Sequence, residues 1–264
     1  MLLEGKNAVV YGGSGEIGSA VARSFAREGA TVHLAARTLS SLEAVAAEIA
    51  EAGGRALVAE LDVLDEAAVN AHAEAVAAEG GIDVALNAVG FAHVQGVPFE
   101  ELSFEQYWHP IDSYLRAICF TSKAVSSSMR ERGSGVILTL STPGSRMSGP
   151  GFLGYGVTCA GVEGFSRILA GELGPAGVRV VCLRPDVIPE SLDRSHVGTI
   201  FDGIAERNGT TAAEMVAGRA QTGTLLGRFP TLAEVADYAA FAASDRAGAM
   251  TGEIANLSCG SLVD

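Results

Sequence analysis

The chain has 264 residues, of which 48% are hydrophobic and 19% are charged, and its formal net charge is −13 at pH 7. This much apolar material excludes an intrinsically disordered chain, and the length is compatible with one α/β domain. The acidic balance disfavours nucleic acid and anionic membranes as partners, because both favour Lys and Arg.

Short runs rich in aliphatic residues alternate with long Ala-rich runs along the chain. Ser40 and Ser41 precede one helical run that stops at Gly53, and Asp65 opens another that stops at Gly80. Such alternation is typical of βαβ units. The predicted strands are Asn7–Tyr11, Thr31–Ala35, Ala56–Ala59, Val84–Asn87, Val136–Leu140, Val178–Leu183 and Glu253–Leu257. The sequence therefore predicts an α/β, single-domain Rossmann fold, a doubly wound seven-stranded parallel sheet with helices on both faces.

The segment 185–230 differs from this pattern. Two short helical patterns, Ile200–Arg207 and Ala212–Arg219, lie there between polar and Gly-containing links. Long connections at the carboxyl edge of such a sheet often carry function. We expect this segment to be a substrate-binding lid within one dinucleotide-binding and catalytic domain that spans residues 1–264.

A glycine-rich turn follows the first predicted strand and leads directly into a helix. Glycines let the backbone approach a pyrophosphate closely, and the amino end of the helix attracts its negative charge. Strand, turn and helix in this order predict dinucleotide binding. The residues expected to contribute are Gly12, Ser14, Gly15, Glu16, Ile17 and Gly18.

The end of the second strand indicates which dinucleotide is preferred. A carboxylate there would bind the ribose hydroxyls of NAD, whereas an arginine can pair with the 2′-phosphate of NADP. The strand ends in Ala35-Ala36-Arg37, with no acidic residue. Arg37 therefore favours NADP as the cofactor over NAD.

Several further motifs carry a family resemblance. Leu61-Asp62-Val63, Asn87-Ala88-Val89-Gly90, Gly151 to Phe165 and Arg184-Pro185 follow the glycine turn at the spacing of the short-chain dehydrogenase/reductase family, which the chain resembles over its whole length. The resemblance implies that the following residues also contact the cofactor: Asp62, Val63, Asn87, Ala88, Val89, Gly90, Pro185 and Val187.

The glycine turn departs from the family's commonest pattern. In the register Thr-Gly-x-x-x-Gly-x-Gly, Glu16 takes the place of the middle glycine. The spacing of Gly12, Gly15 and Gly18 instead is similar to that of the family's extended members, which place a bulky residue at that point. We expect the altered turn to remain competent.

The catalytic positions depart further. The family uses Asn, Ser, Tyr and Lys, and its Tyr-x-x-x-Lys spacing puts both side chains on one helical face, where the ammonium lowers the pKa of the tyrosine. Here Tyr155 is present, but Cys159 replaces the lysine and Tyr114 the asparagine. Thr142, beside Ser141, takes the place of the serine. The candidate catalytic residues are Tyr155, Thr142 and Ser141.

Five further residues lie near the expected site. His93 and His196 could substitute as an acid or base, and Arg146 could bind an acidic substrate group, although each also fits an ordinary loop position. Asp186 stands where the family has glycine, which puts the contacts to the nicotinamide amide in doubt. Cys159 is interpreted as a small buried hydrophobe and not as a nucleophile.

Three functions remain open. The first is an NADP-dependent oxidoreductase that acts on a small-molecule carbonyl or activated double bond. The alternatives are a non-redox enzyme (dehydratase, isomerase or cyclase) and a catalytically inactive binding protein.

Scattered cysteines predict reduced thiols, a cytoplasmic location and no metal site. The helix Phe104–Met129 and the catalytic helix resemble those through which family members form homo-oligomers, so we expect a dimer or tetramer.

Overall fold

The computed structural model describes residues 1–263 and contains one parallel sheet. Its strand order is β3-β2-β1-β4-β5-β6-β7. The strands are β1 (Asn7–Tyr11), β2 (Thr31–Ala36), β3 (Arg55–Glu60), β4 (Val84–Asn87), β5 (Gly135–Leu140), β6 (Val178–Pro185) and β7 (Glu253–Leu257). The predicted seven-stranded, doubly wound Rossmann fold is confirmed, and every predicted strand lies within two residues of its observed bounds.

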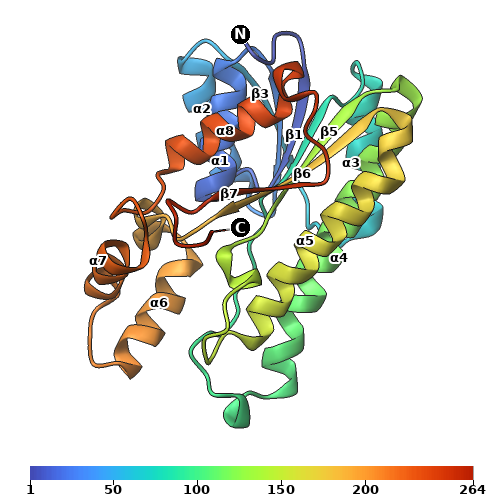
Figure 1. Ribbon diagram of the computed structural model, residues 1–264. Coiled ribbons are helices and arrows are strands. Elements are labelled where there is room, and N and C mark those ends of the chain that lie inside the picture. Colours follow the sequence, from blue (N-terminus) through green and yellow to red (C-terminus); the bar gives the residue numbers. More distant parts are fainter. Residues whose placement is uncertain (264) are drawn as a thin grey trace.

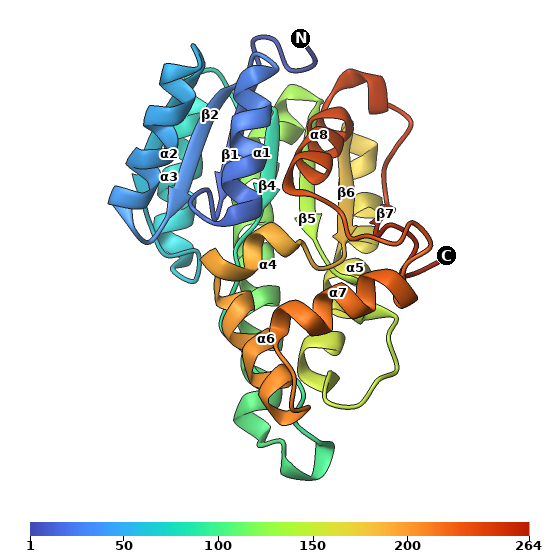
Figure 2. The ribbon, with the colours of Figure 1, turned by 90° about the vertical axis from the view of Figure 1, so that its left-hand side faces the viewer.

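Helices cover both faces of the sheet (Figures 1 and 2). One face carries α1 (Glu16–Arg27), α2 (Leu39–Glu51) and α8 (Leu232–Ala243), and the other carries α3 (Glu66–Ala78), α4 (Phe104–Arg132) and α5 (Leu153–Leu173). The remaining helices, α6 (His196–Arg207) and α7 (Ala212–Gly223), project beyond one end of the sheet.

The two hydrophobic cores follow from strand alternation. Successive residues of a strand point to opposite faces, so Val10 packs with α1, α2 and α8, whereas Val9 packs with α3, α4 and α5. Both side chains are fully buried. Parallel strands that are covered on both faces must be apolar almost throughout, and such continuous apolar runs predict the strands from the sequence.

Helix boundaries were predicted less well than strands. The prediction that Ser40 and Ser41 precede the second helix is wrong, since α2 begins at Leu39 and Thr38 is its N-cap. Asp65 does cap α3, where its carboxylate accepts from two backbone amides. Helix α6 begins four residues before its predicted start, because the Ser195 hydroxyl caps it by accepting from the Val197 amide at 3.3 Å.

The strand order reverses between β1 and β4, and in such sheets ligands bind at that crevice. The turns after these two strands meet there, because the amide of Ala88 donates to the carbonyl of Tyr11 at 2.9 Å. Within residues 1–263, none of the helices combines the length and the apolar character that a membrane span requires.

A buried histidine, His33 on β2, and a half-buried one, His72 on α3, lie between the sheet and that helix, and they predict acid sensitivity. Burial lowers the pKa of His72 from 6.5 to about 4, with nearby His33 contributing, and burial also lowers that of His33. As the pH falls below about 6.5, these histidines therefore bind protons in the unfolded chain while they stay unprotonated in the folded chain. The stability is complete above pH 6.5 and falls as the pH drops toward 4, by up to about 3 kcal/mol for His72.

Denaturant unfolding between pH 7 and pH 4 tests this expectation. His72→Gln should remove a large part of the pH dependence, because glutamine does not titrate. His109→Gln, at an exposed position on α4, is the matched control and should leave it unchanged. A His72→Gln variant as acid-sensitive as the parent would refute the assignment.

Candidate active site

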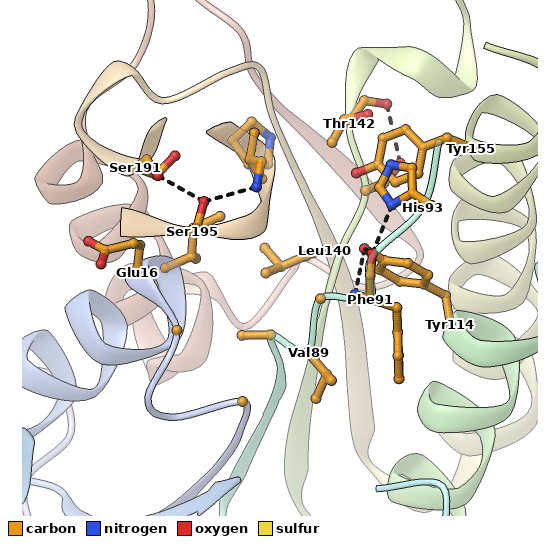
Figure 3. A pocket seen from close by; sticks show the side chains of 18 of the residues that line it. Glu16, Val89, Phe91, His93, Tyr114, Leu140, Thr142, Tyr155, Ser191 and Ser195 are labelled. Carbon is orange, nitrogen blue, oxygen red and sulfur yellow. Dashed lines mark hydrogen bonds between the residues drawn. The ribbon is translucent and has the colours of Figure 1, made fainter. Parts of the chain in front are cut away.

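A cavity opens at the carboxyl ends of β1 and β4, between α6 on one side and α4 and α5 on the other (Figure 3). Its volume is about 390 Å³. Nearly all residues singled out in the sequence line it: Gly12, Ser14, Gly15, Glu16, Ile17, Arg37, Asp62, Val63, Asn87, Ala88, Val89, Gly90, Ser141, Thr142, Tyr155, Pro185 and Val187. Of the predicted cofactor-binding residues, Gly18 is the exception; it is buried beneath the turn.

The glycine turn leaves room for a ligand at the amino end of α1. Gly12 adopts φ +82°, and a Cβ on it would lie 2.5 Å from the carbonyl oxygen of Ala88. A Cβ on Gly18 would overlap the carbonyl oxygen of Gly12. Gly15, the N-cap of α1, offers no side chain to the first helical amides. These features fit a dinucleotide, whose pyrophosphate needs close backbone approach and free amide donors.

Asn87 supplies a second observation that fits a cofactor. Its side chain is 5% exposed, and its Oδ1 accepts a hydrogen bond from the Thr121 hydroxyl. Its Nδ2 has no partner among the described residues. A buried amide donor without a partner is costly, so a ligand in the cavity that Asn87 lines would relieve that cost.

Glu16 opposes this fit in part, because it places a carboxylate on the first turn of α1. Arg37 is exposed, directly follows β2 and lines the cavity at its far end from Tyr155. Asp62 is also exposed, and its carboxylate accepts from the Leu64 amide at 3.0 Å. The charged side chains of this half of the cavity therefore include one cation at the edge where a 2′-phosphate would lie.

The crowding at Gly18 gives a direct test of the glycine turn. Gly18→Ala should distort the turn, cost about 1–3 kcal/mol of stability and weaken binding of NADPH, because the added methyl collides with backbone. Gly164→Ala is the matched control, since a Cβ there meets no atom within 4 Å and alanine favours a helix. Isothermal titration calorimetry with NADPH on folded protein compares them. Equal NADPH affinity in the two variants would contradict the role of the turn.

Tyr155 and Cys159 lie one turn apart on α5, next to Thr142 at the end of β5. The Thr142 hydroxyl is 3.3 Å from the Cys159 sulfur and accepts from the Gly144 amide at 3.2 Å. Cys159 is 3% exposed and does not line the cavity, whereas Thr142 and Tyr155 do. The Cys159 thiol thus packs against Thr142 on the side away from the cavity, whereas Thr142 and Tyr155 line the cavity.

The environment keeps Tyr155 protonated. Burial raises the pKa of its phenol well above the ordinary value of 10, and the neighbouring Cys159 and Tyr114 add to the rise, while a hydrogen bond with Thr142 partly offsets it. Burial likewise raises the pKa of the Cys159 thiol. Tyr155 can therefore donate a proton but is a weak acid, as the loss of a nearby ammonium would predict.

Ser141 is held by a buried network and does not resemble an active hydroxyl. It donates to the Glu163 carboxylate at 3.0 Å, and Ser145 donates to the same oxygen at 2.5 Å. Arg184 faces Glu163 as a buried ion pair at 3.4 Å. The sequence reasoning missed Glu163, although an acid at i+8 from Tyr155 in an Ala/Val/Gly-rich helix indicates that it shares the buried face.

Aromatic side chains form the wall of the cavity beside Tyr155. The rings of His93 and Tyr155 stack with centroids 4.1 Å apart and planes 13° apart. Tyr114, at the family's asparagine position, packs edge-on to Tyr155, and its hydroxyl accepts from the Phe91 amide at 3.0 Å. Tyr114 therefore braces the loop after β4 and does not restore the missing asparagine.

Asp186 is turned toward other protein groups. Both carboxylate oxygens accept from Arg219 on α7 at 2.7 Å, and one also accepts from the Ser261 hydroxyl. Asp186 is 7% exposed, so this pairing neutralises a buried charge beside the cavity. Sequence reasoning missed the pair because Arg219 lies 33 residues downstream.

Two remaining candidates are placed as follows. Arg146 is exposed and is not among the described residues that line the cavity, so the suggestion that it binds an acidic substrate group finds no support in this arrangement. The side chain of His196 lies outside the described part of the chain. His93 lies beside Tyr155.

Comparisons with known proteins agree with this geometry. A family model described as enoyl-(acyl carrier protein) reductase matches residues 13–261. A D-threitol dehydrogenase from Mycolicibacterium smegmatis is 32% identical over 251 residues, 95% of this chain and 90% of the relative. A solved structure titled as a putative short-chain dehydrogenase/reductase from Burkholderia xenovorans is similar at a TM-score of 0.85 and 26% identity, covering 99% of each chain. NAD+-bound xylitol dehydrogenase, at 22% identity and a TM-score of 0.87, shares the fold and covers 98% of this chain and 100% of its own.

Proposed function

The chain belongs to the short-chain dehydrogenase/reductase family of nicotinamide-dependent oxidoreductases, and we propose that it is an NADP-dependent reductase of a small-molecule carbonyl or activated double bond. The observation that carries the proposal is one cavity in which a backbone cradle for a dinucleotide lies beside the protonated Tyr155.

The cradle residues would hold the cofactor. Gly12, Gly15 and Gly18 would give its pyrophosphate access to the amides of α1, and Asn87 to Gly90, which line the cavity, would lie along its nicotinamide side. When bound, NADPH supplies the hydride that reduces the substrate carbon. Asp62 and Val63 would border the adenine, and Pro185 and Val187 would border the nicotinamide.

Thr142 and Tyr155 would act on the substrate oxygen. The Thr142 oxygen accepts from the Gly144 amide and lies 3.3 Å from the Cys159 sulfur, and its hydroxyl would donate to the substrate oxygen. Tyr155 donates the proton that completes the reduction, and the O–H bond of the phenol is the bond that breaks. Reduction of an activated double bond depends less on a strong acid than reduction of a ketone does, which suits a tyrosine of raised pKa.

Arg37 is the test of cofactor choice. Arg37→Asp removes the cation for the 2′-phosphate and offers a carboxylate to the ribose hydroxyls, so the NADPH affinity should fall about 10–100-fold and the NADH affinity should rise. Arg130→Asp, an exposed position on α4, makes the same charge change away from the cavity. Calorimetric titration of both cofactors decides the point. An unchanged ratio of the two affinities in Arg37→Asp would overturn the NADP assignment.

Three broader features complete the proposal. The segment 185–230, which contains α6 and α7, acts as a lid, because it supplies one wall of the cavity. The chain forms a homo-oligomer through α4 and α5, on which Trp108, Val157 and Ile168 are exposed. Its four cysteines are free, which suits the reducing cytoplasm that we propose as its location.

A further inference from the structure

The substrate end of the cavity lies between two walls of different origin. His93, Tyr114 and Tyr155 form one wall, which belongs to the side of α4 and α5 (Figure 3). Val197, Ile200 and Phe201 of α6 line the cavity from the opposite side. Each wall therefore offers rings or aliphatic groups to whatever lies between them.

The charged side chains that line the cavity either lie in its cofactor half or pair with one another. Among its described lining residues the charged ones are Glu16, Arg37, Asp62, Asp186 and Arg219. The first three lie on the turns that would hold the dinucleotide. Asp186 and Arg219 neutralise one another through two contacts of 2.7 Å. The substrate end thus contains no unpaired ionised side chain among the described residues.

Two contacts hold the His93 ring. Its Nδ1 lies 2.8 Å from the carbonyl oxygen of Phe91, which can only accept, so Nδ1 donates there. Its Nε2 lies 2.9 Å from the side-chain amide nitrogen of Gln95. The imidazole therefore contributes a flat surface that extends the ring of Tyr155.

Thr142 and Tyr155 are the polar side chains of this end that we expect to meet a substrate oxygen. Other polar side chains that line it are bonded to protein groups: the Tyr114 hydroxyl to the loop backbone, Ser191 and Ser195 to backbone carbonyls, and Gln95 to His93. A polyhydroxylated substrate would leave most of its hydroxyls without partners, and a charged one would lose its hydration without compensation. Flat rings, in contrast, stack favourably on aromatic walls.

We propose, on the basis of the reductase function above, that the substrate is a neutral, flat, ring-bearing carbonyl compound whose ring lies between the aromatic wall and α6. The carbonyl oxygen meets Thr142 and Tyr155, and the ring extends toward Phe201. The site accordingly selects against carboxylates and against open-chain sugars.

Calorimetry on NADP+-saturated protein tests this without requiring turnover. 4-Methylacetophenone should bind at least about 100-fold more tightly than 4-acetylbenzoate, in which a carboxylate replaces the methyl group, and more tightly than the open-chain ketose D-erythrulose. Phe201→Asp should abolish the binding of 4-methylacetophenone. Phe99→Asp, at a side chain that is 72% exposed outside the cavity, should leave it unchanged.

The outcomes separate this proposal from the function on which it rests. If NADP+ binds but 4-acetylbenzoate or D-erythrulose binds as well as 4-methylacetophenone, or none of the three binds, the substrate class is wrong and the cofactor assignment stands. Equal effects of Phe201→Asp and Phe99→Asp would also overturn it. If NADP+ itself does not bind, the proposed function fails and this inference with it.

Discussion

Replacement of Tyr155 by phenylalanine is expected to lower kcat about 10²–10⁴-fold, the usual contribution of a positioned general acid. Only the hydroxyl is removed, so the ring can keep its stack with His93 at 4.1 Å, and NADPH affinity should stay within about twofold. Steady-state kinetics with 4-methylacetophenone and NADPH, together with calorimetry, measure the two quantities.

A matched control removes a phenol hydroxyl elsewhere. Tyr238→Phe lies on α8, which covers the other face of the sheet and contributes no residue to the cavity among those described. Its kcat should equal that of the parent. A Tyr155→Phe variant with parental kcat would show that proton donation comes from another group and would remove Tyr155 from the mechanism.

Cys159→Lys is expected to raise kcat about 10²-fold, because a cation on the face of α5 that bears Tyr155 lowers the pKa of its phenol. The pH at which activity declines on the alkaline side should move downward in step. Cys159 is buried against Thr142, so the longer side chain costs about 1–3 kcal/mol of stability through crowding. The pH profile of kcat is the measurement.

Cys159→Met is the control, since it matches the added length without the charge. If the lysine and methionine variants share one pH profile and one kcat, the missing ammonium is not what limits this chain. A gain in the lysine variant from a parent with no turnover would instead favour the alternative of a binding protein on the same scaffold.

The fold could be predicted from the sequence because its signals are local. Each strand is a short apolar run between turn residues, and Gly12 to Gly18 follow the first strand directly. The start of α2 was mispredicted because Thr38, Ser40 and Ser41 are all acceptable caps, and only the tertiary setting chose Thr38.

The site was predictable only in its outline. Tyr155 and Thr142 could be placed by spacing along the chain, and both line the cavity. The partners that determine their chemistry come from distant segments: His93 stacks on Tyr155 across 62 residues of sequence, and Glu163 holds Ser141 across 22. Such contacts depend on packing and leave no periodic signal, so the sequence presented Ser141 as equivalent to Thr142.

The role of Asp186 also depends on partners that are distant in the sequence. As a substitution for glycine it suggested a disturbed nicotinamide loop, whereas the fold brings Arg219 and Ser261 to its carboxylate. A buried carboxylate is costly alone and tolerable when paired. Helix α7 and the C-terminal segment are thereby attached to the loop that borders the cavity.

Transfer of deuterium from NADPH deuterated at C4 of the nicotinamide tests the account most directly. Incubated with 4-methylacetophenone, the protein should give an alcohol that carries deuterium at the former carbonyl carbon, detected by mass spectrometry. Incorporation should be absent with heat-denatured protein. Product of unchanged or water-shifted mass, or no product while NADPH binds, would contradict hydride transfer and leave a non-redox enzyme or a binding protein.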